Sequence, residues 1–132
     1  MKRDMDLIRA ILIVIEDDPQ YDGLHFLAPD SSADFGLPDY AFEQLGYHLR
    51  LLFEAGFVEG AAGDLNMYVP YISKLSWRGH ELLDQIRDPE IWRETKEGAR
   101  KAGGFSLDLL GALAKGLIKK KVQDHTGIDL DL

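Results

Sequence analysis

The segment from Phe42 to Val58 restricts the fold more than any other part of the chain. Its apolar residues recur at three- and four-residue intervals, the period of a helix with one buried side. That side holds Phe42, Leu45, Leu49, Leu52 and Phe53. Gly56 follows, and glycine readily adopts the left-handed conformation that ends a helix. We therefore expect a helix from Pro38 that turns at Gly56 directly into a strand beginning at Phe57.

Upstream of this segment, the sequence predicts one helix and one short strand. Met5, Ile8, Leu12 and Ile15 share a helical face between Asp4 and Asp17. Asp18 precedes Pro19, and residues before proline avoid the helical region, so the helix ends there. Residues 24–28 have the character of a short strand between turn residues, and residues 31–37 are expected to form a loop.

Downstream, the pattern predicts a β-hairpin. Residues 57–59 form its first strand, residues 60–64 a glycine-rich tip and residues 67–75 the returning strand. Pro70 has no N–H to donate to a neighbouring strand, which restricts the returning strand to an edge of the sheet.

Three further helices are expected after the hairpin. Ser76 caps a helix that runs to Arg87, and Asp88 with Pro89 starts another that ends at Gly103-Gly104. Ser106 caps the last helix, which reaches the basic run 119–121, where cations favour a helix C-terminus. This helix is apolar on more than one side, so we expect it to pack on the first helix or, alternatively, on a second copy of the chain as a homodimer.

Composition indicates a single domain in a reducing cytoplasm. The 132 residues include no cysteine, which excludes a disulfide framework and sulfur-bound zinc. The apolar run 7–15 is interrupted by Arg9 and ends in acidic residues, so we expect neither a signal peptide nor a membrane span. The net charge is −8, and residues 1–56 hold 4 Lys and Arg against 11 Asp and Glu. This balance disfavours non-specific binding to a nucleic acid backbone.

The order helix, short strand, helix, β-hairpin resembles a winged helix-turn-helix. In such regulators the second long helix is the recognition helix and the hairpin is the wing, and the string Leu52-Phe53-Glu54-Ala55-Gly56-Phe57-Val58 resembles their recognition-helix ending. The resemblance implies a mainly α fold with a small β-hairpin: a winged helix-turn-helix core over residues 1–87, a C-terminal helical extension of the same domain over 88–123, and a flexible tail over 124–132. Little room remains between Leu24 and Pro38 for a complete second helix.

Four strings also resemble a small family of bacterial and phage-associated proteins catalogued as a domain of unknown function. They are residues 1–9, residues 47–49, residues 75–84 and residues 106–108. The family offers no activity to transfer, and it implies the same fold and a prophage-like context.

No catalytic, cofactor or metal site is expected. His80 and Asp84 lie one helical turn apart and His48 could approach them, but a zinc site needs a defined third ligand and none is marked. We expect Asp84 simply to contact His80 on a helix surface. A nucleophile elbow, a phosphate-binding glycine loop and a marked carboxylate pair are all missing from the sequence, so we predict that the chain is not an enzyme.

The candidate binding residues lie on the exposed side of the predicted recognition helix and beside the hairpin. They are Tyr40, Gln44, Tyr47, His48, Arg50, Leu51, Lys74 and Arg78. Tyr, His and Gln side chains can contact bases or phosphates in a major groove, and the three cations could neutralise phosphates. The alternative for His48 is packing at the helix edge, with Tyr47 covering the preceding strand.

Two functions follow from this surface. The first is a prophage-type regulator that reads duplex DNA, with the hairpin tip on the backbone. The alternative is an acidic protein-binding module, such as an antitoxin-like neutraliser or an inhibitor of a host system, that uses Tyr40, Tyr47 and Leu51. The sequence ranks the regulator first, and the fold alone does not choose between the two.

Overall fold

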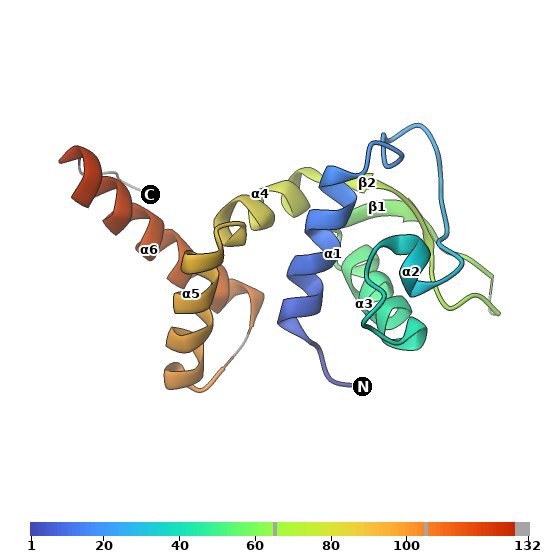
Figure 1. Cartoon of the computed structure of the whole chain (residues 1–132), viewed down its shortest axis with the longest axis horizontal. Helices are drawn as coiled ribbons and strands as arrows, with labels where there is room; N and C mark the ends of the chain where they lie inside the picture. The colour runs from blue at the N-terminus through green and yellow to red at the C-terminus, as the bar shows by residue number, and fades with distance from the viewer. Residues whose placement is uncertain (65, 105, 129–132) are drawn as a thin grey trace. The chain divides into compact units, whose positions relative to one another are not determined.

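The computed structural model describes residues 1–64, 66–104 and 106–128 (Figure 1). This part of the chain contains six helices and one two-stranded antiparallel sheet, so the predicted class, mainly helical with a small β-hairpin, is confirmed. The chain forms two compact units, unit 1 over Met1–Glu81 and unit 2 over Leu82–Leu132. They divide within a helix, α4, whereas the sequence placed the end of the core at residue 87.

Helix α1 spans Met5–Asp17, as predicted. It begins where the Asp4 carboxylate accepts a hydrogen bond from the N–H of Leu7 at 3.1 Å, which satisfies a backbone donor that the first turn cannot pair internally. It ends at Asp18, whose backbone is extended ahead of Pro19. The expected apolar face is buried and consists of Met5, Leu7, Ile8, Ile11, Leu12 and Ile15.

The connection from α1 to the next long helix differs from the prediction. The strand expected over 24–28 is reduced to one antiparallel bridge between Leu27 and Ile72. The loop expected over 31–37 is wrong for Ser32–Phe35, which form α2, a helix of a single turn. The Ser31 hydroxyl accepts the N–H of Asp34 at 3.0 Å and so caps this turn. A helix this short contains no apolar repeat, and periodicity therefore cannot reveal it.

Helix α3 spans Phe42–Glu54 and begins later than the predicted start at Pro38. The N–H of Tyr40 donates to the carbonyl of Leu37 at 3.3 Å, so the residues after Pro38 form a turn first. Leu45, Leu49 and Leu52 are buried, as expected. Phe42 and Phe53 were also expected on the buried side, but they are only half-buried.

The hairpin consists of β1, Val58–Ala61, and β2, Tyr71–Leu75. The strands pair antiparallel with Val58 opposite Leu75 and Ala61 opposite Tyr71, and the register shifts between Glu59 and Gly60. The returning strand is shorter than the predicted 67–75, because it begins only after Pro70. Gly56 has φ +80°, the left-handed conformation expected of the residue that joins α3 to the hairpin.

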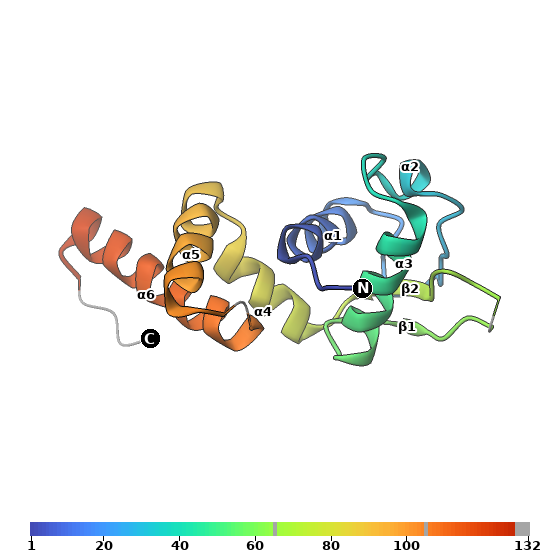
Figure 2. The ribbon, with the colours of Figure 1, turned by 90° about the horizontal axis from the view of Figure 1, so that it is seen from below.

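The core of unit 1 lies where these elements meet. Helix α1 packs on α3 and on β2, and α3 packs on β1, as Figures 1 and 2 show from two directions. Phe35, Leu45, Leu49, Phe57, Val58, Ile72 and Leu75 are buried there together with the apolar face of α1. One side of α3 is thereby packed in the core of unit 1, and its other side faces away from that core.

Helix α4 spans Trp77–Ile86 and starts at the predicted cap. The Ser76 hydroxyl accepts the N–H of Gly79 at 3.0 Å and donates to the carbonyl of Gly56 at 2.6 Å. A single buried side chain therefore caps α4 and ties it to the end of α3.

Unit 2 contains α5, Pro89–Ala102, and α6, Leu107–Thr126, which pack against each other (Figure 2). Both capping predictions for α5 are confirmed: Asp88 accepts the N–H of Ile91 at 3.0 Å, and Gly103 has φ +85°. The hydrogen bond from the Ile91 N–H lowers the pKa of Asp88, with further lowering from Glu90 N–H and Lys121. The cap is therefore complete above the ordinary carboxyl range and is lost as the pH falls through that lowered pKa.

Helix α6 extends beyond the predicted end at the basic run 119–121. It continues to Thr126 and is capped by Gly127 at φ +72°, so the tail predicted from residue 124 is helical at first. Residues 129–132, the end of the predicted tail, lie outside the described part of the chain. Lys121 is thus an interior helix residue, and its ammonium pairs with Asp88 at 3.4 Å. None of the helices in the described ranges has the length and apolar character that crossing a membrane requires.

Candidate interaction surface

The outer face of α3 is the surface opposite its packed side. We define it by six residues: Tyr40, Glu43, Gln44, Tyr47, Leu51 and Glu54. Glu43 and Glu54 are exposed, and the other four are half-buried, so this face is less open than the sequence predicts. Tyr40 lies ahead of the helix rather than on it. The face combines tyrosine and leucine side chains with carboxylates.

His48 does not belong to this face, and its burial does not favour the predicted role as a contact residue. Its side chain is 0% exposed. The imidazole Nε2 accepts the N–H of Asp4 at 2.8 Å, and Nδ1 donates to the carbonyl of Gln44 at 2.8 Å. This pair of bonds fixes one tautomer and attaches the start of α1 to α3. The alternative, a histidine packed at the helix edge, describes its position better.

The three cations predicted near the helix and hairpin all have partners within unit 1. Arg50 donates to the carbonyl of Tyr68. Lys74 pairs with Glu59 at 3.4 Å.

Arg78 lies over the ring of Phe57, 4.1 Å from its centroid, and donates to the carbonyl of Ala55 at 2.6 Å. Arg50 and Arg78 thus tie α3 and its C-terminal end to neighbouring segments, while Lys74 pairs across the hairpin. The contacts of Arg50 and Arg78 compete with binding phosphate, whereas the exposed pair of Lys74 competes only weakly.

Carboxylates surround the N-terminal end of the outer face. Burial raises the pKa of Tyr40, and the charges of Asp4, Asp6 and Asp39 raise it further. The phenol therefore stays neutral at physiological pH, within the field of three acids. With Glu43 on the first turn of α3, this end of the face is negatively charged.

A cleft of about 660 Å³ opens between α3 and the connection of the hairpin. We call it the hairpin cleft. Sequence reasoning missed it, because most of its lining residues lie in the segment between the two strands. The lining consists of Arg50, Phe53 and Glu54 from α3 and of Ala62, Gly63, Asp64, Met67, Tyr68, Val69 and Pro70.

Gly46 explains how the hairpin connection reaches α3. A methyl group at Gly46 would overlap the carbonyl oxygen of Tyr68, so only glycine permits this approach. The Tyr68 ring also meets Phe42 edge-on, with 5.6 Å between the centroids. Because glycine in a helix interior costs about 1 kcal/mol relative to alanine, Gly46 was the sequence signal that could have revealed this contact.

His80 and Asp84, the pair considered as possible metal ligands, do not contact each other as expected. His80 Nδ1 lies 3.3 Å from a carboxylate oxygen of Glu16, and Asp84 pairs instead with Arg87 at 2.8 Å. The expected contact between His80 and Asp84 is therefore replaced by these two pairs. Across the described ranges, no group of three or more potential ligand side chains is arranged to hold a metal ion.

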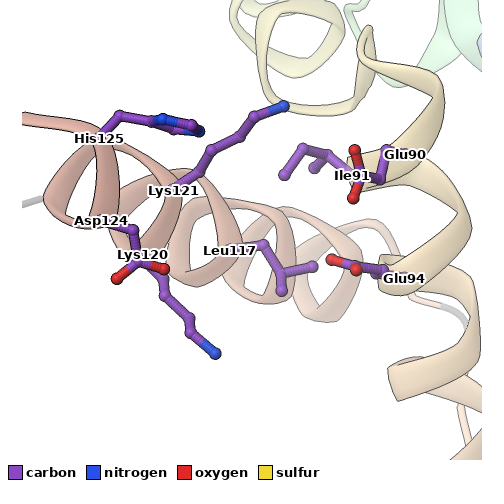
Figure 3. Close-up of a pocket in the computed structure, with 8 residues that line it drawn as sticks. All are labelled: Glu90, Ile91, Glu94, Leu117, Lys120, Lys121, Asp124 and His125. Carbon is purple, nitrogen blue, oxygen red and sulfur yellow. The ribbon is translucent and has the colours of Figure 1, made fainter.

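Unit 2 has a polar cleft of about 300 Å³ between α5 and α6 (Figure 3). Glu90 and Glu94 extend from α5, while Lys120 and Lys121 lie on α6. Acidic and basic groups thus line the same small space. Because they are of mixed sign, this cleft selects for neither an anion nor a cation.

Similarity to other proteins places the chain in a family. The sequence model of the family described as "Hypothetical protein (DUF2513)" matches residues 2–106. An uncharacterized protein of Haemophilus influenzae is 35% identical over 122 residues, which cover 91% of this chain and 98% of the relative. No solved structure matches the chain. The chain therefore belongs to the DUF2513 family.

Proposed function

We propose that the chain is a binding protein rather than an enzyme, and that unit 1 is a winged-helix core that binds a protein partner through the outer face of α3. The order α1, α2, α3, hairpin supports the winged-helix assignment, with α3 as the recognition helix and the hairpin as the wing. The one-turn α2 departs from the usual pattern, in which this position holds a full helix.

One observation favours protein over DNA: the cations beside the outer face already serve the fold. A duplex presents a dense row of phosphates, and a protein that grips it must offer cations to them. Arg50, Lys74 and Arg78 instead bind a carbonyl, a carboxylate, and an aromatic ring with a carbonyl, respectively. The outer face itself carries Glu43 and Glu54, which would repel phosphates.

The same face has the composition of a protein anchor. Tyrosine contributes a large contact area with few rotatable bonds, and aromatic side chains dominate the binding energy of many interfaces. Tyr47 and Leu51 lie one turn apart on α3 and supply an apolar centre. Because carboxylates surround that centre, the complementary surface is basic. A neutraliser of a toxin or an inhibitor of a host protein would fit this description.

A regulator that reads duplex DNA is the second candidate, and the order of helix and hairpin favours it. In that case Gln44 and Tyr47 would contact base edges. Lys2 and Arg3 come just before Asp4, whose N–H donates to His48 of α3, and in that case they would supply cations for phosphates. A prophage-type cytoplasmic setting would suit either candidate.

Replacing Tyr47 with Ala should remove the partner. We expect the tagged full chain, recovered from its native cells, to carry a stoichiometric protein that survives nuclease digestion. Tyr47→Ala should lose that protein because the substitution deletes the apolar anchor. Affinity capture followed by mass spectrometry measures the result.

Tyr71→Ala is the matched control, since Tyr71 is an exposed tyrosine on β2 outside the outer face. It should retain the partner. Retention of the partner by Tyr47→Ala, or its complete loss on nuclease digestion, would contradict the proposed function.

A further inference from the structure

We infer that the hairpin cleft receives an arginine side chain of the protein partner. This inference rests on the proposed function and specifies how that partner is anchored. The cleft adjoins the outer face of α3 because Glu54 belongs to both. A protein lying on the outer face would therefore have residues at the mouth of the cleft.

The size and apolar lining of the cleft suit a long aliphatic stem. Its volume of about 660 Å³ is within the range of ligand pockets in proteins. Phe53, Met67, Val69 and Pro70 line it, and their apolar surface can cover methylene groups. The Tyr68 side chain, also in the lining, is 54% exposed, so its ring is accessible to an incoming group.

The charged groups that line the cleft are two carboxylates and one guanidinium, and this acidic excess favours a cation. Glu54 contributes a carboxylate from α3, and Asp64 contributes another from the hairpin connection. Arg50, the cation among the lining residues, donates to the carbonyl of Tyr68. Both carboxylates would attract a cation in the cleft, whereas an apolar side chain would gain nothing from them.

Arginine fits this combination better than lysine. A guanidinium has five donors in a planar fork and can serve two carboxylates at once. It also stacks on aromatic rings, which Phe53 and Tyr68 provide in the same lining. The ammonium of lysine is a compact, strongly hydrated charge that uses neither feature as well.

The test uses the full chain and N-acetyl-arginine amide as the probe, followed by two-dimensional ¹H–¹⁵N NMR. We expect saturable shifts of amide signals from residues lining the cleft, such as Phe53 and Gly63. N-acetyl-citrulline amide, which has nearly the same shape but no charge, should bind at least roughly tenfold more weakly, because charge-assisted hydrogen bonds contribute about 1.5–3 kcal/mol.

Variants then locate the site. The double variant Glu54→Gln with Asp64→Asn should lose the same preference for arginine over citrulline. Asn at 64 keeps an oxygen for the N–H of Asn66, which Asp64 accepts at 3.0 Å, so the local turn is preserved. Glu81→Gln, which removes an exposed acid of α4 outside both the outer face and the cleft lining, should bind the arginine probe as the unmodified chain does.

Equal binding of the arginine and citrulline probes, or no saturable shift in the cleft, would overturn the inference. That failure is distinct from failure of the proposed function, which depends on capture of a partner and its loss in Tyr47→Ala. If a partner is captured but the arginine probe causes no saturable shift in the cleft, only the arginine site is rejected. If the cleft prefers the arginine probe over the citrulline probe but the chain captures no protein, the proposed function is rejected and the preference of the cleft for arginine stands.

Discussion

Replacing Leu49 with Ala should lower the free energy of unfolding of unit 1 by about 2–5 kcal/mol, the range for buried leucines. Leu49 is 0% exposed and lies on the side of α3 that packs in the core with α1 and β1. The truncation removes apolar burial and leaves a cavity that close-packed neighbours fill only in part. Urea unfolding followed by circular dichroism measures the change, and amide hydrogen exchange in α1 and α3 assigns it to unit 1.

Tyr47→Ala is the control for this prediction, since Tyr47 is a half-buried residue of the same helix. It should cost much less stability than Leu49→Ala. Equal losses for the two variants would show that the packed and outer sides of α3 have been assigned incorrectly.

Replacing His48 with Leu should destabilise unit 1 by roughly 2–4 kcal/mol, even though the new side chain is apolar and of similar size. The substitution removes the acceptor of the Asp4 N–H and the donor to the Gln44 carbonyl. The Asp4 N–H would be left without its partner at a partly buried position where α1 meets α3. Urea unfolding again gives the loss, and hydrogen exchange should show earlier opening at the start of α1.

His25→Leu provides the comparison, because His25 is exposed and pairs only locally with Asp22 at 2.9 Å. Its free energy of unfolding should be nearly unchanged. If His48→Leu were equally neutral, the two hydrogen bonds of His48 would not be holding α1 to α3.

Local sequence signals predicted the long helices well. The packed side of α3 follows from the spacing of Leu45, Leu49 and Leu52, because one turn of helix brings residues three and four apart onto one side. The limits of α5 follow from Asp88 with Pro89 at one end and Gly103 at the other. These signals succeed because capping and amphipathic spacing are properties of consecutive residues.

Contacts between distant segments could not be predicted in this way. The hairpin connection lies on α3 because Gly46 admits the backbone of Tyr68, and no periodicity encodes that pairing. The partners of Arg50 and Arg78 depend on the same tertiary packing, so both side chains looked available for phosphates.

The burial of His48 could not be predicted for a different reason. At 100° per residue it lies at the border between the packed and outer sides of α3, where a small rotation decides burial. The Asp4 N–H donates to Nε2 of His48, which makes burial of the imidazole favourable. That hydrogen bond joins residues far apart in the sequence, so no local pattern predicts it.

These corrections change the order of the two candidate functions. The sequence ranks the DNA regulator first on the order of helix and hairpin. The engagement of Arg50, Lys74 and Arg78 within unit 1, and the acids around Tyr40, favour a protein partner instead. The winged-helix proposal is common to both candidates, so evidence for that fold alone would not separate them.

The most direct test of the central claim is a selection of genomic duplex fragments with the purified full chain at physiological salt. Because few cations are available at the outer face of α3, we predict that no duplex motif is enriched over the input and that binding to random duplex is weak. Enrichment of a defined motif, with binding that is lost in Tyr47→Ala and retained in Tyr71→Ala, would contradict the claim that this face serves a protein partner.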